Sequence, residues 1–392
     1  MTLAALTPDT IFALSPKIQV LPVVHGSGDM AHIVREIIVS RPIDCVAIPL
    51  PPSVQTLVEE GVDQLPVISL VVLPEKNDDG TSGCSYVPID PCQPVITGIR
   101  SAMSEGIPLA YVDREVQRYH PVSWVGPDPY TLKTVSFGAF SAATVPFLPS
   151  PQDQSSRWEH IRWMAFRLHE LELYFSDVLF LCPMTDWPWL RQAYYERMPY
   201  TFPEQRIGLP EWWKVEPDSL YFVLGELPYV THLYEQRREE ARADTHLAID
   251  GIKELVLEAR AQWMSSRSTT IAQESNWVTP QLLQRYFQYV RNLTLLEHRL
   301  KPDLYTLVLA AKQMAGDEFA LRLLETAKTY GYQTQPSLLD TRPSVLMGIG
   351  ELQDPGGDIL PAVNRLQGDP LVWRRVTLRP DPPKPKTQSW AH

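Results

Sequence analysis

The sequence predicts an α/β protein with a mainly parallel sheet flanked by helices and a C-terminal α-helical subdomain. Short β-rich runs alternate with helical patterns through the first half of the chain, as is typical of βαβ units. Beyond about residue 229 the periodicity is helical, and the end of the chain is rich in proline and lysine. We therefore expect an α/β core at 1–230, a helical subdomain at 231–332 and an irregular segment at 333–392 whose last residues, 379–392, are disordered.

The expected strands are short apolar runs between turn residues, a pattern typical of strands that helices cover on both faces. They lie at residues 18–24, 45–48, 67–73, 107–112 and 178–182, with another candidate at 220–224. The helical patterns lie at 30–39, 53–60, 95–104, 157–174 and 189–197. Two other segments are less regular: 132–145 fits a strand or a loop, and 199–218 predicts a long loop.

Four helical segments are expected in the second half of the chain, at 235–263, 280–300, 303–315 and 317–330. Asp303 and Asp317 stand at the start of two of them and suit the N-cap position, where a carboxylate accepts a hydrogen bond from the first turn. Gly331 follows the last segment and suits a helix C-terminus. These features predict a small helical bundle packed on the α/β core.

Composition limits the classes of partner. The chain has 392 residues, of which 44% are hydrophobic and 21% charged, as in an ordinary globular protein. A net charge of −11 without a cluster of Lys and Arg argues against nucleic acid as a partner. No apolar run is long enough to span a bilayer and the first residues lack a signal-peptide pattern, so we expect a cytoplasmic protein with no membrane partner. The four cysteines lack CxxC spacing and fit reduced, buried side chains.

His25 lies where the first predicted strand gives way to a polar turn, and a helical pattern begins at Met30. In open α/β folds, ligands bind beside the carboxyl ends of the parallel strands. Asp113 and Asp186 follow two further predicted strands. We therefore expect the side chains of His25, Asp113 and Asp186 to meet at one edge of the sheet.

Two other interpretations of this turn are rejected. The run GSGDMA at 26–31 fits the loose G-x-G-x-x-A form of the dinucleotide fingerprint, but the second strand ends in Pro49, without the acidic residue that would bind a ribose. His25, Ser27 and Asp29 are too close in sequence to converge as a nucleophilic triad. Ser27 is instead expected to cap the following helix, with Asp29 favoured in its first turn by the helix dipole.

The turn at His25 begins a series of blocks that occur in the order found in a known superfamily. The blocks are PVVH at 22–25, VREII at 34–38, RPIDCVAIPL at 41–50, GIPLAYVDRE at 106–115, Glu159 with RWMA at 162–165, and VLFLCPMTDWP at 178–188. Over roughly residues 18–195 the chain thereby resembles the TraB/TIKI/erythromycin-esterase/ChaN-like superfamily. The resemblance implies a TraB/TIKI-like α/β core.

In that superfamily the active constellation consists of two GxxH histidines and a glutamate at the end of the second strand. The resemblance places His25 at the first histidine, although Pro22 stands where the glycine would be. The glutamate position holds Pro49, and the second histidine position holds Asp186. Members with the full set resemble metallopeptidases or metal-independent esterases, so the resemblance implies a divergent hydrolase that lacks two of three central groups.

The remaining residues still allow a catalytic site, for which we expect His25, Asp113, Asp186 and Glu159. An imidazole of His25 facing the Asp186 carboxylate would serve as a general base or hold a divalent metal. With Asp113 as a second carboxylate, His25, Asp113 and Asp186 would form a set able to ligate Mn²⁺, Fe²⁺, Co²⁺ or Zn²⁺. Arg114, Glu115 and Glu159 would complete the charges of the site.

Simpler structural roles for the same residues stay open. His25 would then be a buried side chain bonded to the backbone, Asp186 a helix cap, and Asp113 part of an ion-paired loop. Glu159 would pair with Arg162, one turn along its helix.

Two functions of different classes follow. The first is a hydrolase, with or without a metal, acting on an ester or amide bond of a small-molecule or peptide substrate. The second is a catalytically inactive pseudoenzyme that serves as a scaffold for a protein partner. Pro49 and Asp186 favour the second function, and the Trp- and Pro-rich segment 199–218 is its candidate contact surface. Analogy at the level of the fold does not choose between them.

Overall fold

The computed structural model describes residues 12–76, 80–122, 124–152, 155–197, 200, 207–240, 250–267, 278–334, 341–368 and 374–379. The chain divides into two compact units. The first comprises Met1–Glu226, Tyr234–Ala248 and Gly331–Leu371, and the second comprises Leu227–Leu233, Ile249–Tyr330 and Val372–His392. The tail that the sequence predicts to be disordered lies, apart from Arg379, outside the described residues.

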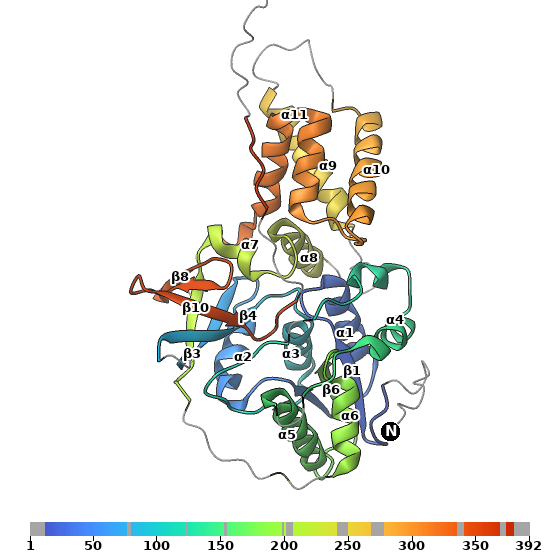
Figure 1. Cartoon of the computed structure of the whole chain (residues 1–392), viewed down its shortest axis with the longest axis vertical. Helices are drawn as coiled ribbons and strands as arrows, with labels where there is room; N and C mark the ends of the chain where they lie inside the picture. Colours follow the sequence, from blue (N-terminus) through green and yellow to red (C-terminus); the bar gives the residue numbers. More distant parts are fainter. Residues whose placement is uncertain are drawn as a thin grey trace, which may run out of the picture. The chain divides into compact units, whose positions relative to one another are not determined.

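Four parallel strands form a sheet in the first unit, and helices flank it, as the sequence predicts (Figure 1). In sheet order the strands are β1 (Ile18–Val23), β6 (Val178–Pro183), β2 (Cys45–Ile48) and β5 (Leu109–Tyr111). Every neighbouring pair is parallel. The carboxyl ends of all four strands therefore lie at the same edge of the sheet.

One face of this sheet packs on helices that follow β5 and β6 in the chain. Val20, Ala47 and Phe180 belong to a buried apolar cluster with residues of α5 (Ser156–Leu171) and α6 (Trp187–Glu196). Burying these side chains removes apolar area from water, which is the main force that holds the layers together.

The opposite face carries α1 (Gly28–Ser40) and α3 (Pro94–Glu105), which pack against each other. The helix α3 approaches β6 so closely that a Cβ on Gly98 would lie 2.3 Å from the side chain of Leu181. A residue with a side chain at position 98 would therefore push α3 away from the sheet. The helix α2 (Gln55–Asp63) packs beside α3.

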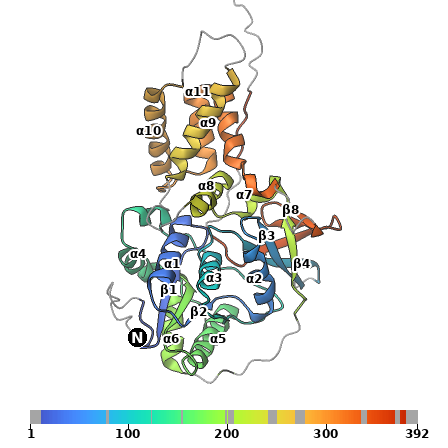
Figure 2. The same ribbon diagram turned by 180° about the vertical axis from the view of Figure 1, so that it is seen from behind.

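Six further strands of the first unit form a closed barrel (Figure 2). They are β3 (Ser69–Lys76), β4 (Ser82–Ile89), β7 (Glu211–Val215), β8 (Ser344–Met347), β9 (Glu351–Gln353) and β10 (Ile359–Asn364), joined in the order β10-β4-β3-β7-β8-β9. The segment 67–73, expected among the parallel strands, thus belongs to a strand that runs antiparallel to both β4 and β7. Its apolar run identifies a buried strand but does not specify the strand's partners.

The C-terminal segment 333–392, expected to be irregular, contributes β8, β9 and β10 to this barrel. These strands are short, and β10 takes its register from β4, with Ala362 opposite Cys84. The prediction fails here because a short strand without strong alternation is stabilised by a distant partner rather than by its own sequence.

Three other segments also differ from expectation. Residues 132–145 are mostly helical, in the 3-10 turn Pro129–Lys133 and in α4 (Phe137–Thr144), because Ser136 caps α4 by accepting a hydrogen bond from Ala139 N–H at 3.4 Å. The candidate strand at 220–224 is the short helix α7 (Leu220–Val223). The expected loop 199–218 contains β7 in its described part. Other 3-10 turns lie at Pro52–Val54, Val145–Phe147, Pro217–Ser219 and Gly331–Thr334.

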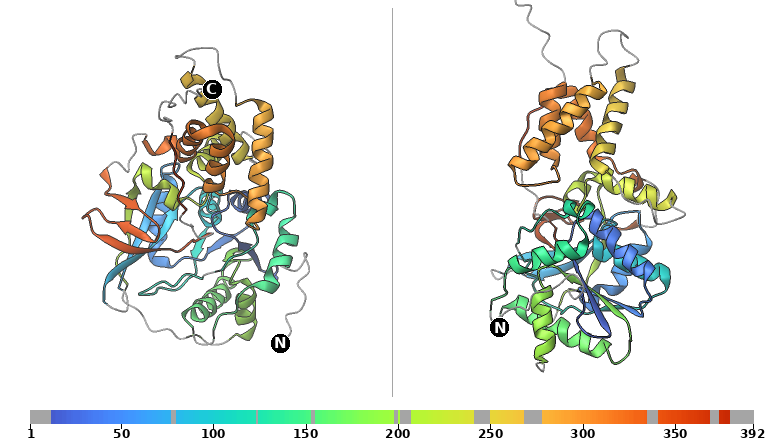
Figure 3. Two further views of the ribbon diagram at one scale, coloured as in Figure 1. Left: turned by 45° about the horizontal axis from the view of Figure 1, so that its top comes forward. Right: turned by 90° about the vertical axis from the view of Figure 1, so that its right-hand side faces the viewer.

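The second unit is helical. Its helices α9 (Gly251–Arg267) and α10 (Pro280–Leu296) both pack against α11 (Leu304–Lys328), as the yellow and orange ribbons of Figure 3 show. The helix α8 (Pro228–Glu240) runs from the second unit into the first. The single helix expected at 235–263 is therefore two helices, whose connection at 241–249 lies outside the described residues.

The ends of α11 agree only partly with the sequence prediction. Asp303 caps it as expected, since its carboxylate accepts a hydrogen bond from Thr306 N–H at 2.7 Å. Gly316 adopts a φ of +82° and breaks the helix just before Asp317, where the second helix was expected to begin. Gly331 opens a 3-10 turn rather than ending the helix. Among the described helices of the chain, none is long and apolar enough to span a bilayer.

Candidate functional site

A cavity of about 170 Å³ lies at the carboxyl edge of the parallel sheet. Because β1, β5 and β6 end at that edge, the residues just after them reach its wall. Its wall includes His25, Asp113, Ser156, Arg157, His160 and Asp186. The structure thus brings three of the four residues expected to be catalytic, His25, Asp113 and Asp186, to one cavity.

The best-defined interaction in the cavity wall joins Asp113 to His160, a residue that the sequence analysis did not select. Asp113 Oδ1 lies 2.7 Å from His160 Nδ1, and both side chains are largely buried. Asp113 Oδ1 also accepts a hydrogen bond from the backbone N–H of Arg114 at 2.7 Å. Because a carboxylate accepts hydrogen bonds but does not donate them, Nδ1 carries the proton when the ring is neutral, and Nε2 then has the lone pair. This arrangement suits a general base.

Asp186 is paired with an arginine rather than with a histidine. Its Oδ1 accepts a hydrogen bond from Arg157 Nε at 2.9 Å, and it makes no side-chain cap to α6. Arg157 also donates to the carbonyl oxygens of Thr185 and Pro149. Burial raises the pKa of Asp186, while Arg157 and, to a lesser extent, His160 act in the opposite direction. The expected helix-cap role is therefore absent, and Asp186 is a partly neutralised carboxylate close to His160.

His25 reaches the cavity as an uncharged side chain. It is followed by Gly26, whose φ of +73° allows the sharp turn after β1 and whose N–H donates to Gln93 Oε1 at 3.1 Å. Burial lowers the pKa of His25 to about 4, against the opposing effect of a hydrogen bond with Gln93. Within the described residues neither Asp113 nor Asp186 hydrogen-bonds to His25, because each carboxylate is engaged elsewhere.

Glu159, the fourth expected catalytic residue, does not line this cavity. Its side chain is 46% exposed and forms an ion pair with the buried Arg114. The alternative pairing of Glu159 with Arg162 does not occur, since Arg162 stacks over the ring of Trp158. His160, the next residue along α5, lines the cavity instead, and no motif or strand end in the sequence singles it out.

The metal site expected at His25, Asp113 and Asp186 is not formed by these side chains. In the part of the chain that the structure describes, no group of three or more His, Cys, Asp or Glu residues is placed to hold a metal ion. Asp113 and Asp186 are hydrogen-bonded to His160 and Arg157 instead.

One wall of the cavity comes from the C-terminal segment that was expected to be irregular. Arg365, just after β10, lines the cavity and is almost fully buried. Its Nε donates to Ser85 Oγ at 2.9 Å, its Nη2 lies 3.5 Å from Glu75 Oε1, and its guanidinium stacks 4.9 Å from the centre of the Tyr119 ring. This buried ion pair fixes the end of the barrel against the site.

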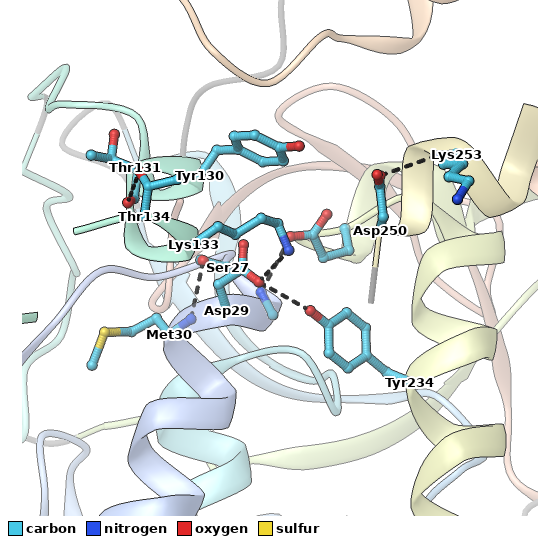
Figure 4. A network of polar contacts seen from close by, with 12 residues as sticks. Ser27, Asp29, Met30, Tyr130, Thr131, Lys133, Thr134, Tyr234, Asp250 and Lys253 are labelled. Atoms are coloured by element: carbon cyan, nitrogen blue, oxygen red, sulfur yellow. Dashed lines mark hydrogen bonds and ion pairs between the residues drawn. The ribbon is translucent and has the colours of Figure 1, made fainter. Parts of the chain in front are cut away.

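The helix α1 begins beside the cavity, and its N-terminus is where a dinucleotide fingerprint would bind phosphate. The structure leaves no room for a phosphate there. Ser27 caps it as expected, accepting a hydrogen bond from Met30 N–H at 3.2 Å (Figure 4). Asp29 accepts from Lys133 Nζ at 2.8 Å and from Tyr234 O–H at 3.4 Å. A Cβ on Gly28 would lie 2.7 Å from the Tyr234 ring. The space over this helix end is thus filled by the chain itself, in agreement with the rejected dinucleotide interpretation.

A buried carboxyl, Asp90, lies under the same turn. It follows β4 and accepts hydrogen bonds from the N–H groups of Cys92 and Gly225, both at 2.8 Å. Burial raises its pKa to about 7, and the nearby Glu226 and Glu235 act in the same direction. Asp90 therefore titrates in the neutral range, outside the cavity wall.

Comparisons of the chain with protein-family models, with curated proteins and with solved structures find no match. The relation to the TraB/TIKI/erythromycin-esterase/ChaN-like superfamily therefore remains a resemblance of sequence blocks.

Proposed function

We propose that the protein is a hydrolase that cleaves an ester or amide bond in the cavity at the carboxyl edge of the sheet, with His160 as general base. The observation that carries this proposal is the 2.7 Å contact between Asp113 Oδ1 and His160 Nδ1 in the cavity wall. A buried carboxylate that fixes the imidazole tautomer is the usual support for a histidine that moves protons.

The chemistry follows from the free Nε2 of His160. Nε2 takes a proton from the attacking hydroxyl group as its oxygen adds to the carbonyl carbon, and it later gives that proton to the leaving alcohol or amine. Asp113 accepts the hydrogen bond from Nδ1 and so holds the ring in one orientation and tautomer while Nε2 takes up and releases the proton. Asp186 lies in the same cavity wall, and its ion pair with Arg157 weakens the stabilisation that its charge can add.

Other residues of the wall fit the binding of a neutral acyl group. His25 is uncharged at neutral pH because burial lowers its pKa to about 4. The wall also contains apolar side chains, among them Val23, Trp124 and Met164. A small-molecule ester or a short peptide is the class of substrate that a cavity of about 170 Å³ with this lining accommodates.

The resemblance to the TraB/TIKI-like superfamily supports the same class of reaction. The chain keeps a histidine, His25, at the end of the first strand, and a polar residue, Asp186, at the second histidine position. His160 takes the role of general base in place of His25, because His160 has the carboxylate partner that His25 lacks within the described residues.

The test is the hydrolysis of p-nitrophenyl acetate and of a panel of activated esters and peptide anilides by the wild-type protein and by His160→Gln. We expect the wild type to exceed the buffer rate and the variant to lose at least about 100-fold in kcat/KM. The matched control is His169→Gln, which removes another α5 histidine that lies outside the cavity. Equal rates for wild type and His160→Gln would overturn the proposal.

A protein-binding scaffold is the second candidate function. The pairing of Asp186 with Arg157 favours it, because an arginine neutralises the residue at a position where the superfamily has a catalytic histidine. This function predicts that no ester or anilide in the panel is hydrolysed above the buffer rate and that a protein partner co-purifies with the full chain. Loss of that partner on exchange of cavity residues would distinguish binding at the cavity from binding elsewhere.

A further inference from the structure

The helix α5 carries a second reactive group into the same cavity. Ser156 is its first residue and lines the cavity together with His160. Residues four apart on a helix lie one above the other on one face, and helical side chains lean toward the N-terminus. Ser156 and His160 therefore lie on one face of α5, and Asp113 Oδ1 lies 2.7 Å from His160 Nδ1.

The two serines at this helix end have different roles. Ser155 is the N-cap, and its Oγ accepts a hydrogen bond from Trp158 N–H at 3.3 Å. Within the described residues the hydroxyl of Ser156 has no hydrogen-bond partner, and this serine is only half-buried in the cavity wall. The cap thus does not require Ser156, and its hydroxyl is available for chemistry.

The backbone around Ser156 supplies donors for a developing negative charge. The first N–H groups of a helix have no acceptor within the helix. Those of Ser156 and Arg157 lie in the first turn of α5, next to the Ser156 side chain. In other hydrolases the N–H that follows the nucleophile stabilises the oxyanion of the intermediate, and Arg157 N–H stands in that position here.

We propose that Ser156 is the nucleophile of this site and that hydrolysis passes through an acyl-serine, which makes the protein a serine hydrolase for esters. This inference rests on the proposed function, since it uses His160 as the base. Asp113, His160 and Ser156 then have the carboxylate, imidazole and hydroxyl roles of a catalytic triad built from two segments. The structure shows no hydrogen bond between Ser156 and His160, and such bonds commonly close only when substrate is bound.

The reaction balances without any further group. Ser156 Oγ forms a bond to the carbonyl carbon while its proton passes to His160 Nε2, and the bond to the leaving alcohol breaks as that proton is delivered to the alcohol oxygen. Water then attacks the acyl-serine and gives a proton to Nε2. The bond from Oγ to the acyl carbon breaks, the acid leaves, and the proton returns to Ser156.

The experiment uses a fluorophosphonate probe, which phosphonylates activated serines without requiring the natural substrate. Full-length protein is incubated with the probe, digested and analysed by mass spectrometry. We expect the label on Ser156, no label in Ser156→Ala, and labelling at least about 100-fold slower in His160→Gln. Ser40→Ala, which removes an exposed serine at the end of α1, is the matched control and keeps the wild-type labelling rate. A label elsewhere, or none, overturns the proposal.

A second variant keeps the test valid if Ser156→Ala does not fold. Ser156→Cys puts a thiol in place of the hydroxyl, and the native Cys45, Cys84, Cys92 and Cys182 are all buried. We expect iodoacetamide to alkylate residue 156 faster than the native cysteines, and at least about 10-fold more slowly when His160→Gln is added. Equal alkylation rates in the two backgrounds would argue against contact between residues 156 and 160 and so against the proposal.

Ester hydrolysis separates failure of this inference from failure of the proposed function. If Ser156→Ala keeps the wild-type rate on p-nitrophenyl acetate while His160→Gln loses it, water is the direct nucleophile, so the general-base function stands and the acyl-serine does not. If the wild type releases a burst of p-nitrophenol near one equivalent and Ser156→Ala does not, the acyl-serine is supported. If the wild type hydrolyses no ester and takes no label, both proposals are overturned.

Discussion

Asp113 Oδ1 and His160 Nδ1 lie 2.7 Å apart, although the two residues are separated by 47 positions in the chain. Asp113 stands just after the edge strand β5, and His160 stands in the second turn of α5. Their contact places a carboxylate–imidazole pair in the wall of the cavity at the carboxyl edge of the parallel sheet.

Asp113→Asn should reduce kcat/KM on p-nitrophenyl acetate by about 10²- to 10⁴-fold. The amide removes the charge that stabilises the imidazolium, and its NH₂ group can donate to Nδ1 and so move the ring proton to Nε2, where it blocks the base. The control is Glu115→Gln on the same loop, whose carboxylate binds Ser53 and which should retain the wild-type rate. An Asp113→Asn variant with more than half of the wild-type kcat/KM would contradict the assigned role.

His25 should make the folded protein less stable in mild acid. Burial lowers its pKa from 6.5 to about 4, so the folded state disfavours the charged ring. The contribution of His25 to stability is fully present above pH 6.5 and is lost as pH falls toward 4, by at most about 3 kcal/mol. We expect the His25→Asn variant to lose this acid-dependent destabilisation, as measured by urea unfolding between pH 4 and 7.

Asp90 should have the opposite effect on stability. Its pKa is raised from 3.8 to about 7, so the folded state favours the neutral acid. Its contribution is fully present below pH 4 and is lost as pH rises through 7, by at most about 4 kcal/mol. In Asp90→Asn the opposing effect of Asp90 is removed, so urea unfolding should show stability that rises with pH between 4 and 6.5, in the direction set by His25.

In the wild type the pH-dependent contributions of His25 and Asp90 to stability partly cancel. Each contribution is therefore measured in the variant that lacks the other residue. His25→Asn and Asp90→Asn should have slopes of opposite sign between pH 4 and 6.5. Identical slopes in both variants and in the wild type would show that neither side chain has the burial described here.

Arg157→Ala should destabilise the fold by about 2–4 kcal/mol at pH 7, because it leaves the Asp186 carboxylate buried without its cation. Asp186→Asn should cost less, since Arg157 keeps the carbonyl oxygens of Thr185 and Pro149 as acceptors. The deficit of Arg157→Ala should be smaller at pH 5 than at pH 7, because burial raises the pKa of Asp186 and the variant removes the arginine that opposes this rise. Urea unfolding of both variants at the two pH values measures this asymmetry, and equal costs at pH 7 would refute it.

The sequence predicts the elements that depend on residues close together in the chain, and it misses those that depend on distant partners. Strands β1, β2 and β6 and the helices α1, α3 and α5 are found close to their expected positions because their apolar periodicity is continuous over a whole element. The caps at Ser27 and Asp303 are also found, because a cap bonds within its own first turn. By contrast, β3 and β8 to β10 needed distant partners, and so their pairing was missed.

The candidate site shows the same division. The sequence by itself determined that His25, Asp113 and Asp186 follow parallel strands, and parallel strands end at one edge of a sheet, so their arrival at one cavity could be predicted. Only the tertiary structure decided which groups pair: Asp113 with His160, Asp186 with Arg157, and Arg365 with Glu75. The physical reason is that the position of a strand end follows from the local backbone and the order of the strands. A hydrogen bond of 2.7 Å such as that between Asp113 and His160 depends instead on how segments far apart in the chain pack together.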